Sequence, residues 1–199
     1  MEAKRLLVLS DTHGNVSALK SVLRWAASRQ AGGVIEAAVF LGDGLHDLSV
    51  AQAEAVFSGE WKKVRGNNDS FYPAPEADVF DFGGNRFFLC HGHRYSLYNG
   101  FDRLIAAAVS NGANAVLFGH LHVPVLEYAQ IPHSTSDKRI FLINPGSISQ
   151  ARSRAGSTFA VIECQPEPPA ECAARASPPV QGLAVKFWGI DRAGNINEI

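Results

Sequence analysis

The chain has 199 residues, a formal net charge of -1 and a hydrophobic content of 46%. This length fits one domain with a sizeable core, and the near-neutral charge argues against a general surface for polyanions. No apolar run approaches the ~20 residues that span a bilayer, and no signal-peptide cleavage site follows the first apolar run. We therefore expect a cytoplasmic protein with no membrane partner.

The first part of the chain predicts alternating strands and helices. Apolar residues recur at helical spacing over residues 16–29, and Asn15 is a plausible N-cap. Further helices are predicted at 48–57 and 100–111. The predicted strands, of which the fourth and fifth form a hairpin, are Arg5–Ser10, Ala37–Leu41, Trp61–Arg65, Val79–Phe82, Arg86–Cys90 and Ala115–Phe118.

The second part of the chain predicts strands only. They are Val123–Tyr128, Ile140–Ile143, Thr158–Glu163 and Leu183–Ile190, with a loop at 130–138 and a Pro-rich loop at about 165–182. This order predicts an α/β fold with two packed sheets and flanking helices. We expect a single domain over residues 1–199. Of the three cysteines, Cys90, Cys164 and Cys172, none forms a C-x-x-C pair, and we expect reduced thiols rather than a Cys164–Cys172 disulfide.

Polar motifs follow several of the predicted strands. The potential ligands in them are Asp11, His13, Asp43, Asn67, His91, His120 and His122. The set contains carboxylate, amide and imidazole groups but no thiolate, which suits hard or borderline divalent metals. It is large enough for two ions.

Each motif alone has an ordinary structural explanation. Asp11 could occupy a turn, as could Asp43 and Asn67, because Asp, Asn and Gly favour turns. The pairs His91/His93 and His120/His122 at strand ends are harder to explain in this way. Five of the seven histidines fall in these motifs, so the joint pattern favours a metal site. Asp43, with two carboxylate oxygens, is the natural bridge between two ions.

The charge balance of such a site favours phosphate chemistry. Two divalent cations against two carboxylates leave a surplus of about two positive charges, which attracts a phosphate group and stabilises its transition state. Two metals also lower the pKa of a water between them, so that hydroxide is available at neutral pH.

The order of these motifs resembles the calcineurin-like metallophosphoesterase superfamily. The residues that carry the resemblance are Asp11-Thr12-His13, Gly42-Asp43, Gly66-Asn67, His91 and Gly119-His120-Leu121-His122. The short length, His91-Gly92-His93 and Asn144-Pro145-Gly146-Ser147 make the chain similar to the small YfcE-type phosphodiesterases. The resemblance covers about residues 5–164.

The resemblance implies a fold of two mixed β-sheets packed face to face as a sandwich, flanked by helices. It also implies two divalent ions, manganese foremost, with iron, zinc, nickel or cobalt as alternatives. One ion would be held by Asp11, His13, Asp43 and His122, and the other by Asp43, Asn67, His91 and His120, so that Asp43 bridges. The implied activity is hydrolysis of phosphate esters, above all phosphodiesters, by a bridging hydroxide that attacks phosphorus in line.

One position departs from the family's pattern. Many members have a His after the Gly-Asn pair, where it can protonate the leaving group, and this chain has Asn68 there. An amide cannot donate a proton in this role, so His93 is our candidate for the acid, and both residues are catalytic candidates. Asn15, Arg65 and Arg94 are candidates for contacting the substrate.

Two other functions remain open at this point. The same fold serves as an interaction platform in Vps29, so a catalytically weak scaffold is one alternative. A nuclease is the other, although the chain has no basic stripe and we do not expect nucleic acid as a partner. The expected partner is a small phosphate ester, and a homo-oligomer is possible.

Overall fold

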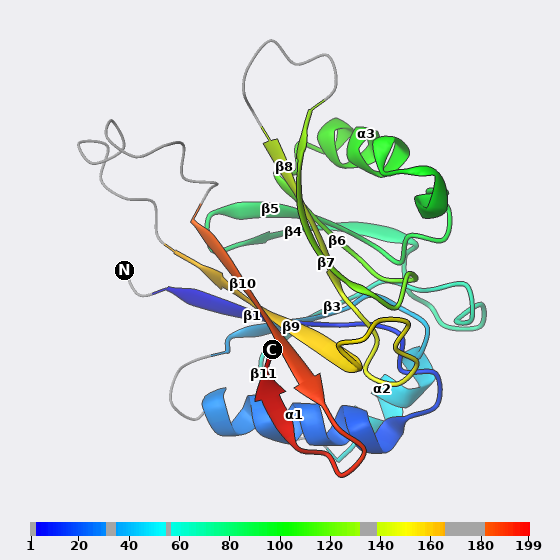
Figure 1. Cartoon of the computed structure of the whole chain (residues 1–199), viewed down its shortest axis with the longest axis vertical. Coiled ribbons are helices and arrows are strands. Elements are labelled where there is room, and N and C mark those ends of the chain that lie inside the picture. The colour runs from blue at the N-terminus through cyan, green and yellow to red at the C-terminus, as the bar shows by residue number, and fades with distance from the viewer. Residues whose placement is uncertain (1–2, 31–34, 55–56, 132–138, 166–181) are drawn as a thin grey trace.

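Two β-sheets lie face to face between helices in the computed structural model (Figure 1). The structure describes residues 3–30, 35–54, 57–131, 139–165 and 182–199. The six-stranded sheet has the order β11-β10-β9-β1-β2-β3 and the five-stranded sheet the order β4-β5-β6-β8-β7. Both sheets are mixed, since β1, β2 and β3 are parallel while β9 runs antiparallel to β1.

The elements have the following bounds. The six-stranded sheet consists of β1 (Lys4–Leu9), β2 (Ala37–Phe40), β3 (Glu60–Lys63), β9 (Ser157–Cys164), β10 (Leu183–Ile190) and β11 (Ile196–Glu198). The five-stranded sheet consists of β4 (Ala77–Phe82), β5 (Asn85–Cys90), β6 (Ala115–Phe118), β7 (Pro124–Gln130) and β8 (Arg139–Pro145). The helices are α1 (Val16–Gln30), α2 (Leu45–Gln52) and α3 (Asp102–Ser110), with a 3-10 turn at Leu97–Asn99.

The central strands of each sheet are buried on both faces, and this explains their continuous apolar runs. In β1, Leu7 and Leu9 pack with α1 and α2 on the outer face. The alternate residues Leu6 and Val8 pack between the sheets, against residues such as Phe87 of β5. A third cluster joins α3 to the outer face of the five-stranded sheet. The α/β sandwich predicted from the sequence is therefore confirmed.

Some boundaries were predicted wrongly. The helix expected at 48–57 begins at Leu45 and ends at Gln52, because Leu45 and Leu48 are one turn apart and both reach the core below α1. The strand expected at Val123–Tyr128 continues to Gln130, so Gln130 is not in the predicted loop. The rest of that loop beyond residue 131, residues 166–181 of the Pro-rich loop, and Cys172 lie outside the described residues.

Two further elements were not predicted. The short strand β11 pairs with β10 through Trp188–Ile190, and the turn at Leu97–Asn99 precedes α3. Cys90 and Cys164 are both buried, and burial raises the pKa of the Cys164 thiol to about 12. No helix in the described part of the chain has the length and apolar character to cross a membrane.

Candidate metal centre

The predicted ligands meet at one edge of the sandwich, where the parallel strands of both sheets end. Strands β1, β2 and β3 are parallel in one sheet, and β5, β6 and β8 are parallel in the other. Their carboxyl ends therefore present loops to a common edge, which is where α/β sheets usually bind ligands. Asp11 and His13 follow β1, Asp43 follows β2, His91 follows β5, and His122 follows β6.

The first group of converging atoms contains Asp11, His13 and His122. Asp11 Oδ1 lies 3.1 Å from Nε2 of His122 and 3.5 Å from Nε2 of His13. The two imidazole Nε2 atoms are 3.1 Å apart. Residues separated by more than a hundred positions thus offer three ligand atoms to one point.

The second group contains Asp11, Asp43 and His91. His91 Nε2 lies 3.4 Å from Asp43 Oδ2 and 3.9 Å from Asp11 Oδ1. Asp11 is common to both groups, and Asp43 Oδ2 also lies 3.9 Å from Nε2 of His13. Both carboxylates are therefore placed between the two sets of imidazoles. The assignment of Asp43 as the bridge stays a prediction.

Backbone carbonyls orient two of the histidines. His91 Nδ1 is 2.7 Å from the carbonyl oxygen of Leu41, and His122 Nδ1 is 2.8 Å from that of Gln150. A carbonyl oxygen only accepts, so each Nδ1 carries the proton and each Nε2 presents a lone pair to the site. This second contact is what metal-binding histidines commonly make.

The atoms that face the centre fit a cation. Asp11 Oδ1 and His91 Nε2 are buried and have no hydrogen-bond partner among the described residues. The other oxygen of Asp11 is already satisfied by the hydroxyl of Ser10 at 2.6 Å and the backbone N–H of His120 at 3.0 Å. Buried acceptors that face one another without donors are unfavourable. A divalent cation between them removes this penalty, and the oxygen and imidazole donors suit one.

Backbone strain is concentrated at the same residues. Five candidate ligands have left-handed φ angles, namely Asp11 (56°), His13 (41°), Asp43 (57°), His120 (70°) and His122 (59°). The sixth non-glycine residue of this kind in the described chain is Ser96. Such conformations cost about 1 to 3 kcal/mol each and persist where surrounding structure fixes them for function. No pattern in the sequence predicts these backbone conformations.

Glycines allow the ligand loops to approach closely. A Cβ atom at Gly66 would overlap Oδ1 of Asp43 and lie 2.6 Å from the backbone N of Asp43. A Cβ atom at Gly119 would overlap the Ser10 hydroxyl and lie 2.9 Å from Oδ2 of Asp11. The glycines of these motifs therefore make room for the carboxylates.

Two buried carboxylates outside the ligand set hold the loops. Asp69 accepts backbone N–H groups at both oxygens: Asp43 (2.6 Å) and Gly66 (2.9 Å) at Oδ2, and Gly44 (3.0 Å) and Leu45 (2.9 Å) at Oδ1. Asp47 accepts the Thr12 hydroxyl and the Gly14 N–H, the latter at 2.7 Å. Sequence analysis missed both residues, because Asp69 follows Asn68 as in an ordinary turn and Asp47 is one acidic residue in the first turn of α2.

The turn at Asn144–Ser147 also supports the centre. The Asn144 amide donates to the Gly119 carbonyl at 2.7 Å, and the Ser147 hydroxyl donates to the Asp11 carbonyl at 2.7 Å. Both side chains are fully buried. They tie the loops after β1 and β6 to the end of β8.

The titration of the cluster follows from its mutual contacts. Burial opposes ionisation of Asp11, but the imidazoles of His122 and His13 hold the pKa of this carboxyl below its usual range. Burial likewise opposes the charged form of His91, but Asp43 and Asp11 raise the pKa of its imidazole. The close Asp11 carboxylate, 3.5 Å away, raises the pKa of His13. In the absence of a metal, these contacts therefore favour the ionised form of Asp11 and the protonated forms of His13 and His91. A bound cation would take the place of those protons.

The remaining predicted ligands lie at the rim. The ring of His120 is half-buried, and its centroid lies 5.2 Å from that of His91. Asn67 is exposed. The amide in contact with Asp43 belongs to Asn68, whose backbone N–H donates to Oδ1 at 2.8 Å and whose side-chain amide donates to Oδ2 at 2.6 Å. The ligand roles of His120 and Asn67 stay predictions.

The catalytic and substrate candidates have mixed surroundings. His93 is half-buried, with its ring centroid 5.5 Å from that of His91, and its Nδ1 has no partner among the described residues. Arg65 and Arg94 both donate to Oε1 of Glu76, at 2.9 and 2.7 Å. One carboxylate shared by two guanidiniums leaves a net positive charge. Asn15 Oδ1 accepts the N–H of Ala18 at 3.1 Å and so caps α1, as expected.

Comparison with known proteins identifies the family and the fold of the chain. Residues 5–167 match the model of the calcineurin-like phosphoesterase superfamily domain. No curated protein matches the chain. The chain is similar to a Streptococcus pneumoniae protein described as a predicted phosphoesterase, with 25% identity and a TM-score of 0.69, covering 100% of this chain and 98% of that one.

Two more distant structures share the fold. One is Vps29 of Entamoeba histolytica in complex with zinc, with 17% identity, a TM-score of 0.65, and coverage of 98% of this chain and 97% of that one. The other is an archaeal phosphodiesterase, with 16% identity, a TM-score of 0.56, and coverage of 98% of each chain.

Proposed function

Because the chain belongs to the calcineurin-like phosphoesterase superfamily, we propose that it is a di-metal hydrolase of phosphodiesters. The observation that carries this proposal is the buried convergence of Asp11 and Asp43 with Nε2 atoms of three histidines. We further propose that manganese is the working ion, with iron, zinc, nickel or cobalt as alternatives. The same donor set accommodates each of these ions.

Different residues of the site would retain the ions and orient the ligands in such a reaction. When bound, two divalent ions would supply positive charge to the phosphoryl oxygens and a hydroxide nucleophile at neutral pH. Asp11 and Asp43 provide the negative charge that retains the ions, while His91 and His122 are held by Leu41 and Gln150 in the tautomer that leaves Nε2 free. The carbonyl contacts therefore set the geometry before substrate arrives.

The groups around Asp43 bear on the choice of substrate. Asn68 donates twice to the Asp43 carboxylate, so its amide serves to orient Asp43. His93 is our proposed leaving-group acid, and burial and the neighbouring His91 lower the pKa of its imidazole. A lowered pKa makes the protonated ring a stronger acid but a minority form at neutral pH. We therefore propose that esters with good leaving groups are the faster substrates.

The proposal is tested with a panel of phosphomonoesters and phosphodiesters after metal stripping and re-addition of each candidate ion. We expect no turnover in the stripped protein and the highest turnover of bis(4-nitrophenyl) phosphate with manganese. The variant Asp43→Asn should lose more than about a hundredfold in kcat/KM. Mutation of residues that only orient metal ligands typically lowers metal affinity or activity by about 10- to 100-fold, and Asp43 is itself a proposed ligand. Wild-type turnover by an Asp43→Asn sample of verified metal content would refute the mechanism.

The scaffold alternative gives the opposite result in the same panel. A chain that binds both ions in full but hydrolyses no ester would be an interaction platform. This is the alternative role that we consider for this chain, whose fold is shared with Vps29. We prefer the enzyme because Asp11, Asp43, His13, His91 and His122 are all present and converge. Backbone strain of this kind clusters at functional sites, and metal-dependent hydrolysis gives these strained and buried residues such a function.

A further inference from the structure

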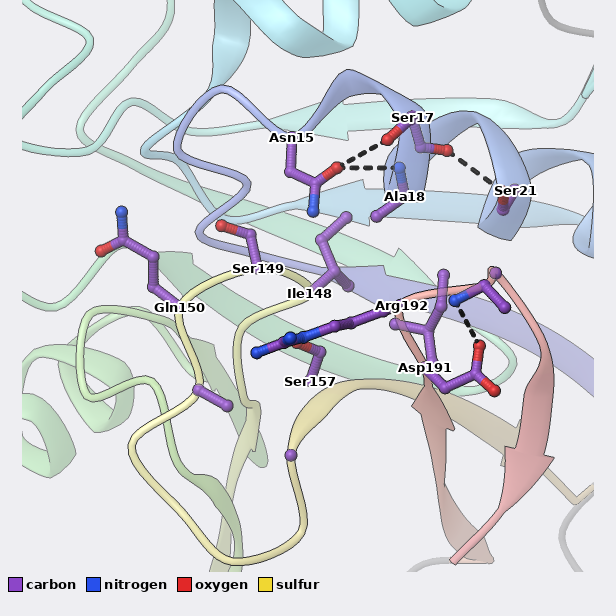
Figure 2. Close-up of a pocket in the computed structure, with 15 residues that line it drawn as sticks. Asn15, Ser17, Ala18, Ser21, Ile148, Ser149, Gln150, Ser157, Asp191 and Arg192 are labelled. Carbon is purple, nitrogen blue, oxygen red and sulfur yellow. Dashed lines mark hydrogen bonds between the residues drawn. The ribbon is translucent and has the colours of Figure 1, made fainter.

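A polar pocket of about 710 Å³, drawn in Figure 2, includes Gln150, whose carbonyl oxygen contacts His122 of the metal centre. Its walls come from the start of α1, the loop that follows β8, and the turn between β10 and β11. The volume is within the range of small-molecule sites. None of the residues proposed as metal ligands or catalytic groups lines it, so it offers space for a part of the substrate that does not react.

The pocket and the metal centre share a wall. Gln150 lines the pocket, and its carbonyl oxygen is the acceptor that orients His122. Ser149 and Gln150 donate their backbone N–H groups to the Ser147 hydroxyl, which itself donates to the Asp11 carbonyl. Asn15, on the opposite wall, follows the loop of His13 directly. The pocket therefore adjoins the segments that hold His122 and His13.

Hydroxyl groups are the main polar groups of the lining. Among the described residues that line the pocket, Arg192 is the one cation, and it has no ion pair. Serine hydroxyls come from Ser17, Ser21, Ser149 and Ser157, with amides from Asn15 and Gln150, and no aromatic ring is present in the lining. Figure 2 shows the Arg192 side chain extending from the β10–β11 turn into the pocket, toward the loop of Ser149 and Gln150. The arginines with ion pairs in the described chain are Arg5, Arg65, Arg86 and Arg94.

The acid next to Arg192 is already engaged. Asp191 Oδ1 accepts the N–H groups of Ala193 at 2.8 Å and Asn195 at 2.9 Å, and Oδ2 accepts the Asn195 amide at 2.8 Å. Asp191 thus closes the turn that presents Arg192 and does not neutralise it by an ion pair. The guanidinium remains available for an anion, which it can bind with two parallel hydrogen bonds.

We propose that this pocket binds the non-reacting arm of the phosphodiester, and that this arm carries hydroxyl groups and an anionic group held by Arg192. The inference rests on the proposed function, because it assigns the second half of the same substrate. A polyol or sugar acid arm, or a phosphorylated polyol arm, has this chemistry. The absence of aromatic side chains from the lining disfavours an arm that binds by stacking of a base.

The test compares 4-nitrophenyl phosphodiesters that differ only in the second arm: ethyl, 2,3-dihydroxypropyl, and the dihydroxypropyl arm with a terminal carboxylate or phosphate in place of one hydroxyl. The manganese-loaded wild type should show its lowest KM for one of the two anionic arms. In Arg192→Gln, KM for that arm should rise about tenfold with kcat unchanged, since the contact is remote from the reacting bond. Arg192→Lys should recover part of the loss.

The matched control is Arg139→Gln, which makes the same change at an exposed residue at the start of β8 and should leave every KM unchanged. Equal KM values for the four arms in the wild type, or an equal loss in both variants, would overturn the inference while leaving the phosphodiesterase in place. A titration of the full chain with glycerol 3-phosphate before metal loading provides a readout without turnover. Binding that requires Arg192 supports the pocket even if no ester is hydrolysed, whereas binding unaffected by Arg192→Gln contradicts it.

Discussion

Replacement of Asp69 by Asn tests whether a buried carboxylate outside the ligand set holds the metal loops together. Asp69 is 3% exposed and accepts four backbone N–H groups, two at each oxygen. Asn has the same shape but only one acceptor oxygen. Whichever way the amide is turned, its NH₂ group faces two N–H donors that lose their acceptor.

The expected cost follows from these contacts. A buried donor left without a partner costs about 1 to 3 kcal/mol. The two donors that keep an acceptor bond to a neutral amide oxygen in place of a carboxylate, and such hydrogen bonds are weaker. The loops relax in part, so we expect a loss of about 3 kcal/mol in the free energy of unfolding. This is a large fraction of the 5 to 15 kcal/mol typical of a domain. With a urea m-value of roughly 2 kcal/mol/M, the midpoint falls by about 1.5 M.

The assay is urea unfolding of the metal-free chain, with Asp81→Asn as the matched control. Asp81 bears the same charge but lies on the surface in an ion pair with Arg86, so its replacement should leave the midpoint nearly unchanged. Asp69→Asn should also weaken manganese binding, because in either orientation of the amide the loop that carries Asp43 loses backbone anchors. Coinciding unfolding curves for the two variants would show that Asp69 does not hold these loops.

Four further predictions concern pH, metal and the leaving group. Contacts with carboxylates raise the pKa of His13 and His91 above 6.5, so manganese affinity should fall as the pH drops through those raised values. Calorimetry in buffers of different ionisation enthalpy should detect the release of protons when manganese binds. An affinity that does not change from pH 5 to 8 would contradict this prediction. In the metal-free chain the same histidines contribute stability below pH 6.5, and this stability is lost as the pH rises through their folded pKa values. The lowered pKa values of Asp11 and Asp43 contribute stability above pH 3.8, and this stability is lost in acid. Thermal unfolding of the metal-free chain should therefore show its highest midpoint between about pH 4 and 6.5. Manganese at 100 times its Kd should add about 2.7 kcal/mol and raise Tm by about 5 to 10 °C, and an unchanged midpoint would mean that the folded site does not bind it. His93→Gln should slow alkyl diesters by about a hundredfold but 4-nitrophenyl diesters by only a fewfold, and equal effects on both would remove His93 as the acid.

Much of the fold and the ligand set could be predicted because their signals are local. A buried parallel strand is a short apolar run, and its carboxyl end is marked by a glycine and a polar residue, as at Gly42-Asp43. Where several such ends occur, the parallel arrangement brings them to one edge. This is why Asp11, Asp43, His91 and His122 were identified and do converge.

The supporting residues could not be predicted because their role depends on contacts between distant segments. Asp69 has the sequence context of a turn residue, and Asp47 lies in the first turn of α2. Only the structure shows that Asp69 accepts the backbone N–H of Asp43 and that Asp47 accepts that of Gly14. Arg65 and Arg94 were candidates for the substrate on charge alone. Their shared contact with Glu76 depends on how the segments fold together.

The pocket beside the metal centre could not be predicted from sequence patterns either. Its walls come from the start of α1, from residues after β8, and from the turn after β10, three segments with no common motif. Arg192 lies next to Asp191 and would be taken for half of a surface ion pair. The structure instead has Asp191 bonded within its own turn.

The central claim is that two cations share the carboxylates of this site, and the most direct measurement is a crystal structure of the manganese-loaded chain with anomalous scattering data. We predict two anomalous peaks at the edge of the sandwich, one contacting His13 and His122 and the other contacting His91, with the Asp43 carboxylate between them. A single peak, or two peaks with Asp43 turned away from both, would contradict the claim.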